Sequence, residues 1–496
     1  MASIVRNFIA GKWVDSLSGQ RFEKTNPADT REVVASVTIS AREDVDRAVE
    51  AARRVQRDWK ALPAPKRGEI LFRAGELLLR KKHELGTLVT REMGKVLAEG
   101  LGDVQEAIDM ANLMAGEGRR LSGETVPSEL PDKDCKSVRE PHGVTALITP
   151  WNFPTAIPAW KIFPALICGN TVVLKPSSAT PACAAGLVQA LQEAGVPEGV
   201  VNLVLGPGEE VGEYLATHPG VDAVSFTGSC SAGEHLETLL GAKHRPLALE
   251  MGGKNAIIVM DDADLHLALE GVLWGAFGTS GQRCTASSRV LVHASLYERF
   301  LEALKSATER LKIGPGLNPS TDVGPLVNEQ QLSRVLKYIG IGQEEGARLV
   351  FGGNRILDGD RAHGYFVEPT IFADVLPRMR IAQEEIFGPV VSVLRFATLE
   401  EAITIVNDVP FGLSSAMYTR DVNTSARAER DLQTGLVYIN ASTIGAEIQL
   451  PFGGWKHSGS GHPEAGGRGG ALDFYSRVKV IYRDFSGRLQ KAQIDS

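Results

Sequence analysis

Apolar residues recur at helical spacing in the first hundred residues of the chain. The segment Ser40–Glu43 has the form of a capping box, in which a Ser side chain caps the start of a helix and a Glu reaches back to it. Leu, Glu, Lys and Arg dominate the region from Lys66 to about Ala98, which predicts a long helical region. The apolar positions that follow the capping box on one helix face are Val45, Ala48, Val49, Ala52 and Val55.

Short β-rich runs then alternate with helix-like stretches. This alternation predicts βαβ units, and hence a parallel sheet with helices on both faces. A second alternating block runs from Val290 to about Gly435, so the predicted fold class is α/β. The predicted strands of the first block are Val144–Ile148, Thr171–Leu174, Val201–Leu205, Ala223–Thr227 and Ala256–Met260, and its helices include Pro181–Ala194 and Glu209–Thr217.

The last regular segment is Arg477–Arg483, where apolar and polar residues alternate as in a half-buried strand. It follows a glycine-rich run from Ser458 to Gly470 that is typical of a loop. A strand at the end of a chain needs a pairing partner, and a neighbouring subunit could supply an edge.

Length and composition narrow the class of protein. The 496 residues favour about three domains, and the net charge of −7 argues against a nucleic-acid partner, which would require a basic face. The N-terminus lacks the apolar core of a secretion signal. The apolar stretch Ala156–Leu174 is interrupted by Lys161 and Pro164, so we expect no membrane span. Five cysteines without paired spacing predict neither disulfides nor a metal site, and hence a cytoplasmic protein.

One cysteine has an unusual setting. Cys284 follows the flexible run Gly278–Gly281 and lies between Arg283 and Thr285, in surroundings too polar for a typical core residue. A loop allows backbone donors to approach, and an adjacent Arg favours the thiolate, so this thiol is a candidate nucleophile. On spacing alone a structural cysteine is an equal alternative. Of the other cysteines, we expect Cys168 and Cys183 to be buried, Cys135 to be exposed in a loop, and Cys230 to be either.

Two further segments hold groups that thiol chemistry needs. Glu250 stands beside a double glycine in Leu249–Lys254, and apolar surroundings would raise its pKa towards that of a general base at neutral pH. Asn152 ends a strand between two prolines, where its amide could donate a hydrogen bond to an oxyanion. Each has a plain alternative, namely an exposed Glu paired with Lys254 and a turn-forming Asn.

The order of the motifs points to a family. The segments TPWNFP, VVLKPS, FTGS, LEMGGK, GQRC, EEIFGPV and PFGGWKHSG occur in this order and extend over essentially the whole chain. Together they resemble the aldehyde dehydrogenase superfamily. The resemblance implies a Rossmann-like cofactor domain, an α/β catalytic domain and a small β oligomerisation element. In this arrangement 1–122 and 143–252 bind NAD(P), 253–450 are catalytic, and 123–142 with 471–496 join the subunits of a homotetramer.

The same resemblance implies an oxidation that produces NAD(P)H. Cys284 would attack an aldehyde to give a thiohemiacetal, and loss of hydride would leave a thioester that is hydrolysed with Glu250 as the base. Asn152 and the backbone N–H of Cys284 would form the oxyanion hole, and Glu464 would help to relay protons. The expected cofactor contacts are Thr149, Pro150, Trp151, Lys175, Ser177, Ser178, Gly208, Phe226, Thr227, Gly228, Ser229, Glu250, Met251, Gly252, Glu385 and Phe387.

Position 178 bears on the choice of cofactor. The run Gly228–Gly233 follows a strand and opens a helix, where N–H groups can meet a pyrophosphate. By the same resemblance, Lys175 corresponds to the family residue that contacts the adenosine ribose of the cofactor. Three residues after this lysine, NAD-preferring relatives usually have a Glu, where this chain has Ser178. A neutral side chain tolerates a 2′-phosphate that a carboxylate would repel, so we expect NADP to be preferred and NAD to be usable. The alternative is that Ser178 only starts the next helix and both cofactors bind.

The substrate prediction concerns the surroundings of the thiol. The motifs are similar to those of enzymes for carboxylate-bearing semialdehydes, such as 2-oxoglutarate semialdehyde, in which case Arg283 would pair with the distal carboxylate. The alternative is a structural Arg283 and an apolar pocket for general aliphatic or aromatic aldehydes. The expected substrate contacts are Arg283, Thr285, Phe153, Trp160 and Phe452, with Trp151 and Trp455 as further apolar walls.

Three rival functions remain at this point. A cysteine hydrolase or esterase would use Cys284 but would not need Lys175, Ser229 and Glu385. A non-catalytic structural relative would have no reason to keep the nucleophile, the base and the oxyanion amide together. A coenzyme-A-acylating enzyme would dispense with Glu250, so hydrolysis of the thioester is the favoured reading.

Overall fold

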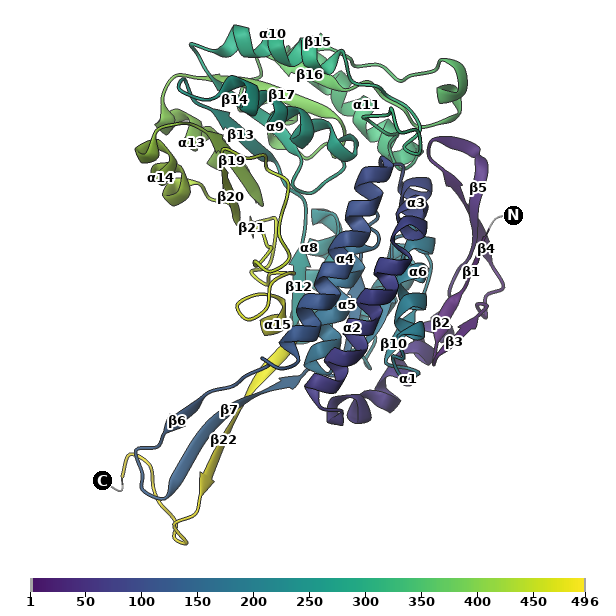
Figure 1. Ribbon diagram of the computed structural model, residues 1–496, viewed down its shortest axis with the longest axis vertical. Coiled ribbons are helices and arrows are strands. Elements are labelled where there is room, and N and C mark those ends of the chain that lie inside the picture. The colour runs from purple at the N-terminus through teal and green to yellow at the C-terminus, as the bar shows by residue number, and fades with distance from the viewer. Residues whose placement is uncertain (1–2, 495–496) are drawn as a thin grey trace.

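The computed structural model describes residues 3–494, so the ends of the predicted domain ranges, 1–2 and 495–496, lie outside the described residues. Figure 1 shows two lobes, each built on a sheet, and a long arm that projects away from them. Within 3–494, no helix has the length and apolar character that crossing a membrane requires. A small sheet at the N-terminus has the order β1-β5-β4, with β1 (Ser3–Val5), β4 (Arg21–Asn26) and β5 (Asp29–Thr38).

The first lobe contains a seven-stranded sheet in the order β12-β11-β8-β9-β10-β2-β3. The strands from β12 to β10 pair in parallel, and β2 and β3 add to them antiparallel. Every residue of β8, β9 and β11 is buried, as expected for strands covered on both faces. The predicted parallel sheet is therefore confirmed. Its strands are β2 (Asn7–Ile9), β3 (Lys12–Val14), β8 (Val144–Ile148), β9 (Thr171–Lys175), β10 (Val201–Leu203), β11 (Ala223–Thr227) and β12 (Leu247–Glu250).

The second lobe contains another seven-stranded sheet, in the order β15-β16-β17-β14-β13-β19-β20. All neighbours pair in parallel except β15, which is antiparallel to β16. Its strands are β13 (Asn255–Val259), β14 (Ser287–His293), β15 (Arg348–Phe351), β16 (Thr370–Ala373), β17 (Val390–Phe396), β19 (Ser414–Tyr418) and β20 (Leu436–Ile439). Its helices are α9 (Leu265–Phe277), α10 (Tyr297–Thr308), α11 (Glu329–Glu344), α12 (Arg380–Gln383), α13 (Leu399–Asn407) and α14 (Val422–Asp431).

The helical region predicted near Lys66–Ala98 is divided into three helices that pack together (Figure 1). Gly94 ends α3 with a φ of 100°, a left-handed cap that favours glycine. The prediction of helix is confirmed, but the sequence pattern missed the breaks. The helices of this lobe are α1 (Arg42–Ala61), α2 (Ala64–Arg80), α3 (Lys82–Met93), α4 (Leu97–Glu117), α5 (Ala156–Cys168), α6 (Pro181–Glu193), α7 (Glu213–Thr217) and α8 (Cys230–Gly241), with a π-helical turn at Gly208–Gly212.

Helix α5 explains the apolar stretch that begins at Ala156. Every position of α5 is buried, which is typical of a helix that is hydrophobic all round and lies inside a protein. The helix is followed directly by β9, whose five residues are buried as well. The two interruptions named in the sequence, Lys161 and Pro164, therefore both lie inside this core helix, which ends at Gly169.

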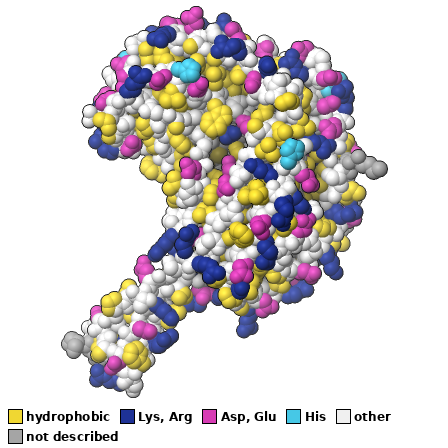
Figure 2. All heavy atoms as spheres, in the orientation of Figure 1, with side chains coloured by type: hydrophobic (Ala, Val, Ile, Leu, Met, Phe, Trp, Pro, Cys, Tyr) yellow, Lys and Arg dark blue, Asp and Glu magenta, His cyan; other side chains and the backbone are white. Residues whose placement is uncertain are grey.

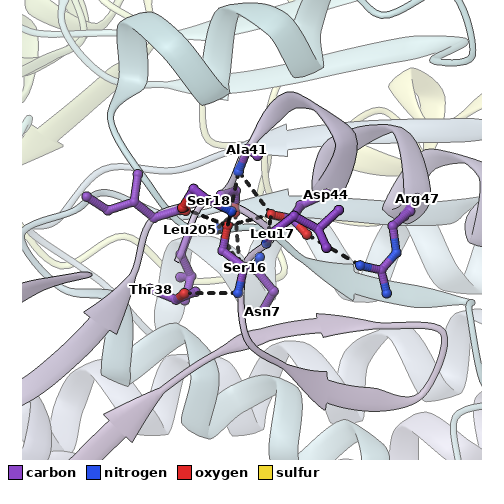
Figure 3. A network of polar contacts seen from close by, with 11 residues as sticks. Asn7, Ser16, Leu17, Ser18, Thr38, Ala41, Asp44, Arg47 and Leu205 are labelled. Carbon is purple, nitrogen blue, oxygen red and sulfur yellow. Dashed lines mark hydrogen bonds and ion pairs between the residues drawn. The ribbon is translucent and has the colours of Figure 1, made fainter. Parts of the chain in front are cut away.

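The start of α1 differs from the predicted capping box. Ala41, not Ser40, is the N-cap, and Asp44 accepts a hydrogen bond from the Ala41 N–H at 2.9 Å. The same carboxylate accepts from the Ser16 hydroxyl at 2.6 Å, within the polar network of Figure 3. These contacts join the N-terminal segment to the first helix. The buried carboxylate of Asp44 therefore caps the start of α1, a role that the sequence pattern assigned to Ser40 and Glu43.

The arm is a three-stranded sheet of β6 (Thr125–Pro127), β7 (Lys133–Pro141) and β22 (Ser476–Asp484), in the order β22-β7-β6. The predicted strand at Arg477–Arg483 is confirmed, and its partner within the chain is β7, with Ser476 opposite Pro141 and Asp484 opposite Lys133. Most of β22 is exposed, so the expected half-buried pattern is wrong for the single chain. Cys135, expected in an exposed loop, is buried in β7. The remaining elements are β18 (Phe411–Gly412), β21 (Trp455–Lys456) and α15 (Ala471–Phe474).

Candidate active site

Cys284 lies where two cavities adjoin. A cavity of about 570 Å³ on one side and a cavity of about 400 Å³ on the other side share Ile157, Thr227 and Cys284 as wall residues. The predicted site residues on the wall of the larger cavity are Pro150, Trp151, Asn152, Thr227, Gly228, Ser229, Met251, Gly252, Glu385 and Phe387. Those on the wall of the smaller cavity are Phe153, Trp160, Glu250, Arg283, Thr285, Phe452 and Glu464.

The turn before the thiol has a strained backbone. Thr279 and Ser280 have φ values of 52° and 56°, in the left-handed region, which is costly for a β-branched residue. The Thr279 N–H donates to Glu99 at 2.7 Å, and the Ser280 hydroxyl donates to the Gly324 carbonyl at 2.7 Å. These contacts with distant parts of the chain hold the turn in the shape that presents Cys284.

The surroundings of Cys284 bear on the protonation state of its thiol. Burial raises the pKa of Cys284 well above its usual value, and the nearby Glu250 carboxyl raises it further. Arg283 instead donates to Glu99 at 3.2 Å and to the Thr279 hydroxyl at 2.8 Å. The guanidinium of Arg283 is thus engaged by Glu99 and Thr279, and its effect on the thiolate stays a prediction.

Glu250, the predicted base, is buried on the wall of the smaller cavity. It ends β12 and is 1% exposed, with one carboxyl oxygen 3.3 Å from the Gly454 N–H and the other without a partner in the described part of the chain. Burial raises the pKa of Glu250 well above its usual range, and Glu464 adds to the shift. Lys254 is itself buried and its Nζ has no partner among residues 3–494, so the alternative of an exposed Glu250–Lys254 pair is wrong.

The double glycine after the base allows three segments to meet. A Cβ on Gly252 would lie 2.3 Å from a carboxyl oxygen of Glu385, and one on Gly253 would lie 2.8 Å from the Cys284 carbonyl. Glu385 accepts from the Gly253 N–H at 2.9 Å, and Asn255 donates to the Cys284 carbonyl at 2.7 Å. Any side chain here would push the thiol loop or Glu385 away from the base.

Helix α4 holds the loop that contains Asn152. It follows β8 in a loop, is 3% exposed and lines the larger cavity beside Cys284. Asp103 of α4 accepts from the Thr155 N–H at 3.1 Å and the Ala156 N–H at 2.7 Å, and it forms an ion pair with Lys95 at 3.1 Å. The sequence interpretation missed Asp103, because a single acid on a helix looks like a solvated charge.

Glu464 belongs to a buried polar network next to the base. It forms an ion pair with Lys161 of α5 and accepts a hydrogen bond from the Thr227 hydroxyl. The Lys161 ammonium also donates to the Ser225 hydroxyl at 2.7 Å. All four side chains are buried, so any proton that leaves Glu250 in this direction meets a connected set of polar groups.

The segment after β11 has the features of a phosphate site. Helix α8 starts at Cys230 with Ser229 as its N-cap, which confirms the predicted strand-to-helix turn. Lys175, at the end of β9, is 4% exposed, and burial lowers its pKa to about 8. Its ammonium group forms no hydrogen bond or ion pair with any residue from 3 to 494. A helix N-terminus and an unpaired buried ammonium both suit an anionic group.

Ser178 does not start a helix. Helix α6 begins at Pro181 with Thr180 as its N-cap, and the Ser178 hydroxyl donates to the Gly206 carbonyl at 2.8 Å. The alternative that this serine is only a helix cap is therefore wrong. Its neutral side chain lies in the segment that follows Lys175, as predicted from the motif.

Several predicted contacts lie off the cavity walls. Phe226 packs in the core beneath the larger cavity, and Trp455 is 54% exposed in β21, so Trp455 is wrong as a wall of the substrate pocket. The predicted cofactor contacts that line neither cavity are Thr149, Lys175, Ser177, Ser178, Gly208 and Phe226. Wall residues that the sequence interpretation missed are Glu99, Asp103, Glu106, Trp274, Gln331, Arg334 and Tyr338.

The fold consists of two α/β lobes, and two adjoining cavities share the half-buried Cys284 as a wall residue. The chain belongs to the aldehyde dehydrogenase family, whose model matches residues 13–481. It is 44% identical to an alpha-ketoglutaric semialdehyde dehydrogenase of Bacillus subtilis, over 96% of this chain and 97% of that one. It is 43% identical to an alpha-ketoglutarate semialdehyde dehydrogenase of Haloferax volcanii, over 97% and 99%.

Solved structures have the same fold. Betaine aldehyde dehydrogenase from Staphylococcus aureus in complex with NAD⁺ is 36% identical, with a TM-score of 0.95 over 99% of this chain and 97% of that chain. The protein is thus an NAD(P)-dependent aldehyde dehydrogenase.

Proposed function

We propose that the protein oxidises a carboxylate-bearing semialdehyde to a dicarboxylate through a thioester on Cys284. The observation that carries this proposal is the position of Cys284 between two cavities, which lets an aldehyde and a nicotinamide approach the thiol from different sides. The names of the two relatives support the substrate class. Arg283 on the wall of the smaller cavity provides a cation for the distal carboxylate.

The chain supplies the groups for each proton transfer. Glu250 takes the proton of Cys284, and the sulfur attacks the aldehyde carbon. The Asn152 amide and the Cys284 N–H donate to the oxyanion of the thiohemiacetal. A bound nicotinamide supplies the hydride acceptor, after which a thioester remains. Glu250 passes this proton on through Glu464 and Lys161, and it then takes a proton from the water that attacks the thioester. The C–S bond breaks, the carboxylic acid leaves, and the proton on Glu250 returns to the Cys284 sulfur.

We propose that NADP is the preferred cofactor and that NAD is also used. The α8 N-terminus with Ser229 would hold the pyrophosphate, and Glu385 and Phe387 would hold the nicotinamide ribose. Lys175 suits a 2′-phosphate because it is buried without an opposing carboxylate, and Ser178 adds no negative charge there.

Kinetics with the purified protein test the proposed reaction. We expect NADPH to form with 2-oxoglutarate semialdehyde at a kcat/KM about tenfold or more above that for pentanal, because an ion-paired hydrogen bond contributes about 1.5–3 kcal/mol. Equal values for the two aldehydes would favour the broad-specificity alternative. Ester hydrolysis without any NAD(P)H formation would favour the cysteine hydrolase.

We also propose that the arm joins subunits into a homotetramer. Val126, Val478, Val480 and Tyr482 are each at least half exposed on the arm, and Figure 2 shows hydrophobic side chains on its surface. The outer edge of β22 has no partner strand in the sheet of the arm, so it suits edge pairing with a second copy.

Light scattering tests the assembly. We expect the unmodified protein to have the mass of a tetramer and Val480→Glu to form smaller species. The control is Val422→Glu on α14, where the valine is 74% exposed away from the arm. A monomeric unmodified protein, or identical masses for all three proteins, would overturn the proposal.

A further inference from the structure

Helix α4 presents three acidic residues to the smaller cavity. Glu99, Asp103 and Glu106 are four and three positions apart, so they lie on one face of the helix, and all three line this cavity together with Cys284. Glu99 is paired with Arg283 at 3.2 Å, and Asp103 is paired with Lys95 at 3.1 Å. Two of the three acids are therefore neutralised by cations.

Glu106 is the exception. Its carboxyl group forms no hydrogen bond or ion pair with any residue in the described range 3–494, although Glu106 lines the cavity. Burial raises the pKa of Glu106 to about 8, and the carboxylates of Asp103 and Asp109 on the same helix add to the shift. Arg283 from the thiol loop and Lys95 from the segment before α4 act in the opposite direction.

The charge of this cavity wall thus depends on Glu106. When Glu106 is protonated, the carboxylates of Glu99 and Asp103 are offset by Arg283 and Lys95. When Glu106 is ionised, the wall has an excess negative charge. An anionic aldehyde enters the cavity more easily when Glu106 is protonated than when it is ionised, because like charges repel strongly in a partly desolvated site.

We propose that Glu106 determines the charge selectivity of the substrate pocket. In its protonated form the carboxyl donates a hydrogen bond to the distal carboxylate of the semialdehyde beside Arg283, and in its ionised form it repels that carboxylate. A carboxylic acid is a strong donor to a carboxylate, and the bound anion in turn favours the protonated acid. This inference rests on the proposed semialdehyde substrate.

The test is the pH dependence of selectivity, measured as the ratio of kcat/KM for the semialdehyde to kcat/KM for pentanal. We would measure kcat/KM for 2-oxoglutarate semialdehyde and for pentanal with the purified enzyme and saturating cofactor, from about pH 6 to about pH 9.5. Ionisations of Cys284 and Glu250 act on both aldehydes, so they cancel in the semialdehyde-to-pentanal ratio. We expect the ratio to fall about tenfold between about pH 7 and about pH 9 as Glu106 ionises.

Two variants locate the effect. Glu106→Gln keeps a neutral donor of the same shape, so we expect a high ratio that no longer changes with pH. Glu76→Gln is the control, because Glu76 is exposed on α2 and does not line the cavity, and it should keep the profile of the unmodified enzyme. The profile of the unmodified enzyme tests the proposal even if Glu106→Gln folds poorly.

The outcomes separate this inference from the function on which it rests. A ratio that stays constant with pH in the unmodified enzyme, or a Glu106→Gln enzyme with the original pH dependence, would overturn the role of Glu106 alone. Absence of semialdehyde oxidation at every pH would overturn the proposed substrate and this inference with it. A preference for a trimethylammonium aldehyde that grows with pH would show that the ionised acid selects cations instead.

Discussion

The substitution Glu250→Gln is expected to separate the two halves of the reaction. Burial and Glu464 raise the pKa of Glu250, which favours its neutral form, and an amide resembles that form in shape and charge. The Gly454 N–H reaches one carboxyl oxygen at 3.3 Å, and the Gln amide oxygen can accept the same bond. We therefore expect the free energy of unfolding to change by less than about 1 kcal/mol.

The effect on turnover is expected to be far larger than the effect on stability. An amide cannot take a proton from water, and a positioned general base contributes about 10²–10⁴-fold to a rate, or about 3–5 kcal/mol of activation free energy. Hydrolysis of the thioester should slow by that factor, so one NAD(P)H forms per site before the steady state. The burst itself should be slower than in the unmodified enzyme, because Glu250 also faces the protonated thiol of Cys284.

Rapid mixing of enzyme and cofactor with aldehyde, followed by NAD(P)H absorbance, measures both phases. In the unmodified enzyme the steady-state rate should rise with pH as Glu250 ionises, and this rise should be lost in the variant. Glu447→Gln, on an exposed loop residue, is the control and should behave as the unmodified enzyme. Normal turnover by Glu250→Gln would show that another group is the base, and a missing burst with intact cofactor binding would show that Glu250 acts before the thioester forms.

Two further substitutions test the cofactor and oxyanion segments. Ser178→Glu should shift the NADP-to-NAD ratio of kcat/KM towards NAD, and strong discrimination against NADP by the unmodified enzyme would contradict the argument from this position. Asp103→Asn should lower kcat about tenfold with little change in cofactor affinity. The neutral amide accepts weaker hydrogen bonds from the Thr155 and Ala156 N–H groups than the carboxylate does, so the loop that contains Asn152 is held less firmly. An unchanged kcat in this variant would mean that the loop keeps its shape without the charge.

The sequence predicted the parallel strands well because their signal is local. β8 and β11 coincide with predicted runs, and each is a short apolar segment between loops. Asn152, Glu250 and Glu464, which line the same cavities as Cys284, were also identified, since each lies in a short motif and the order of the motifs is specific. The acids of α4 on the same walls were missed. The helix breaks at Lys81 and Gly94 were missed, because residues with good helix propensity continue on both sides of them.

The charge partners could not be predicted from the sequence. Arg283 and Glu99 are 184 positions apart, and only the fold brings α4 against the thiol loop. The same holds for Lys161 and Glu464, which are 303 positions apart. Sequence patterns place a charged residue on an element, but they do not show whether it is paired, and pairing decides whether Arg283 can activate a thiol.

The buried acids around the thiol also bear on product release. Burial raises the pKa of Glu250 and of Glu385, which favours the neutral form of both carboxyl groups. In the proposed reaction, oxidation adds a second carboxylate to the semialdehyde at the carbon next to Cys284, on the side of Glu250 and Glu464. Since the product has one more negative charge than the substrate in the same surroundings, its repulsion from ionised Glu250 favours release. The acids that make hydrolysis possible therefore also disfavour rebinding of the dicarboxylate.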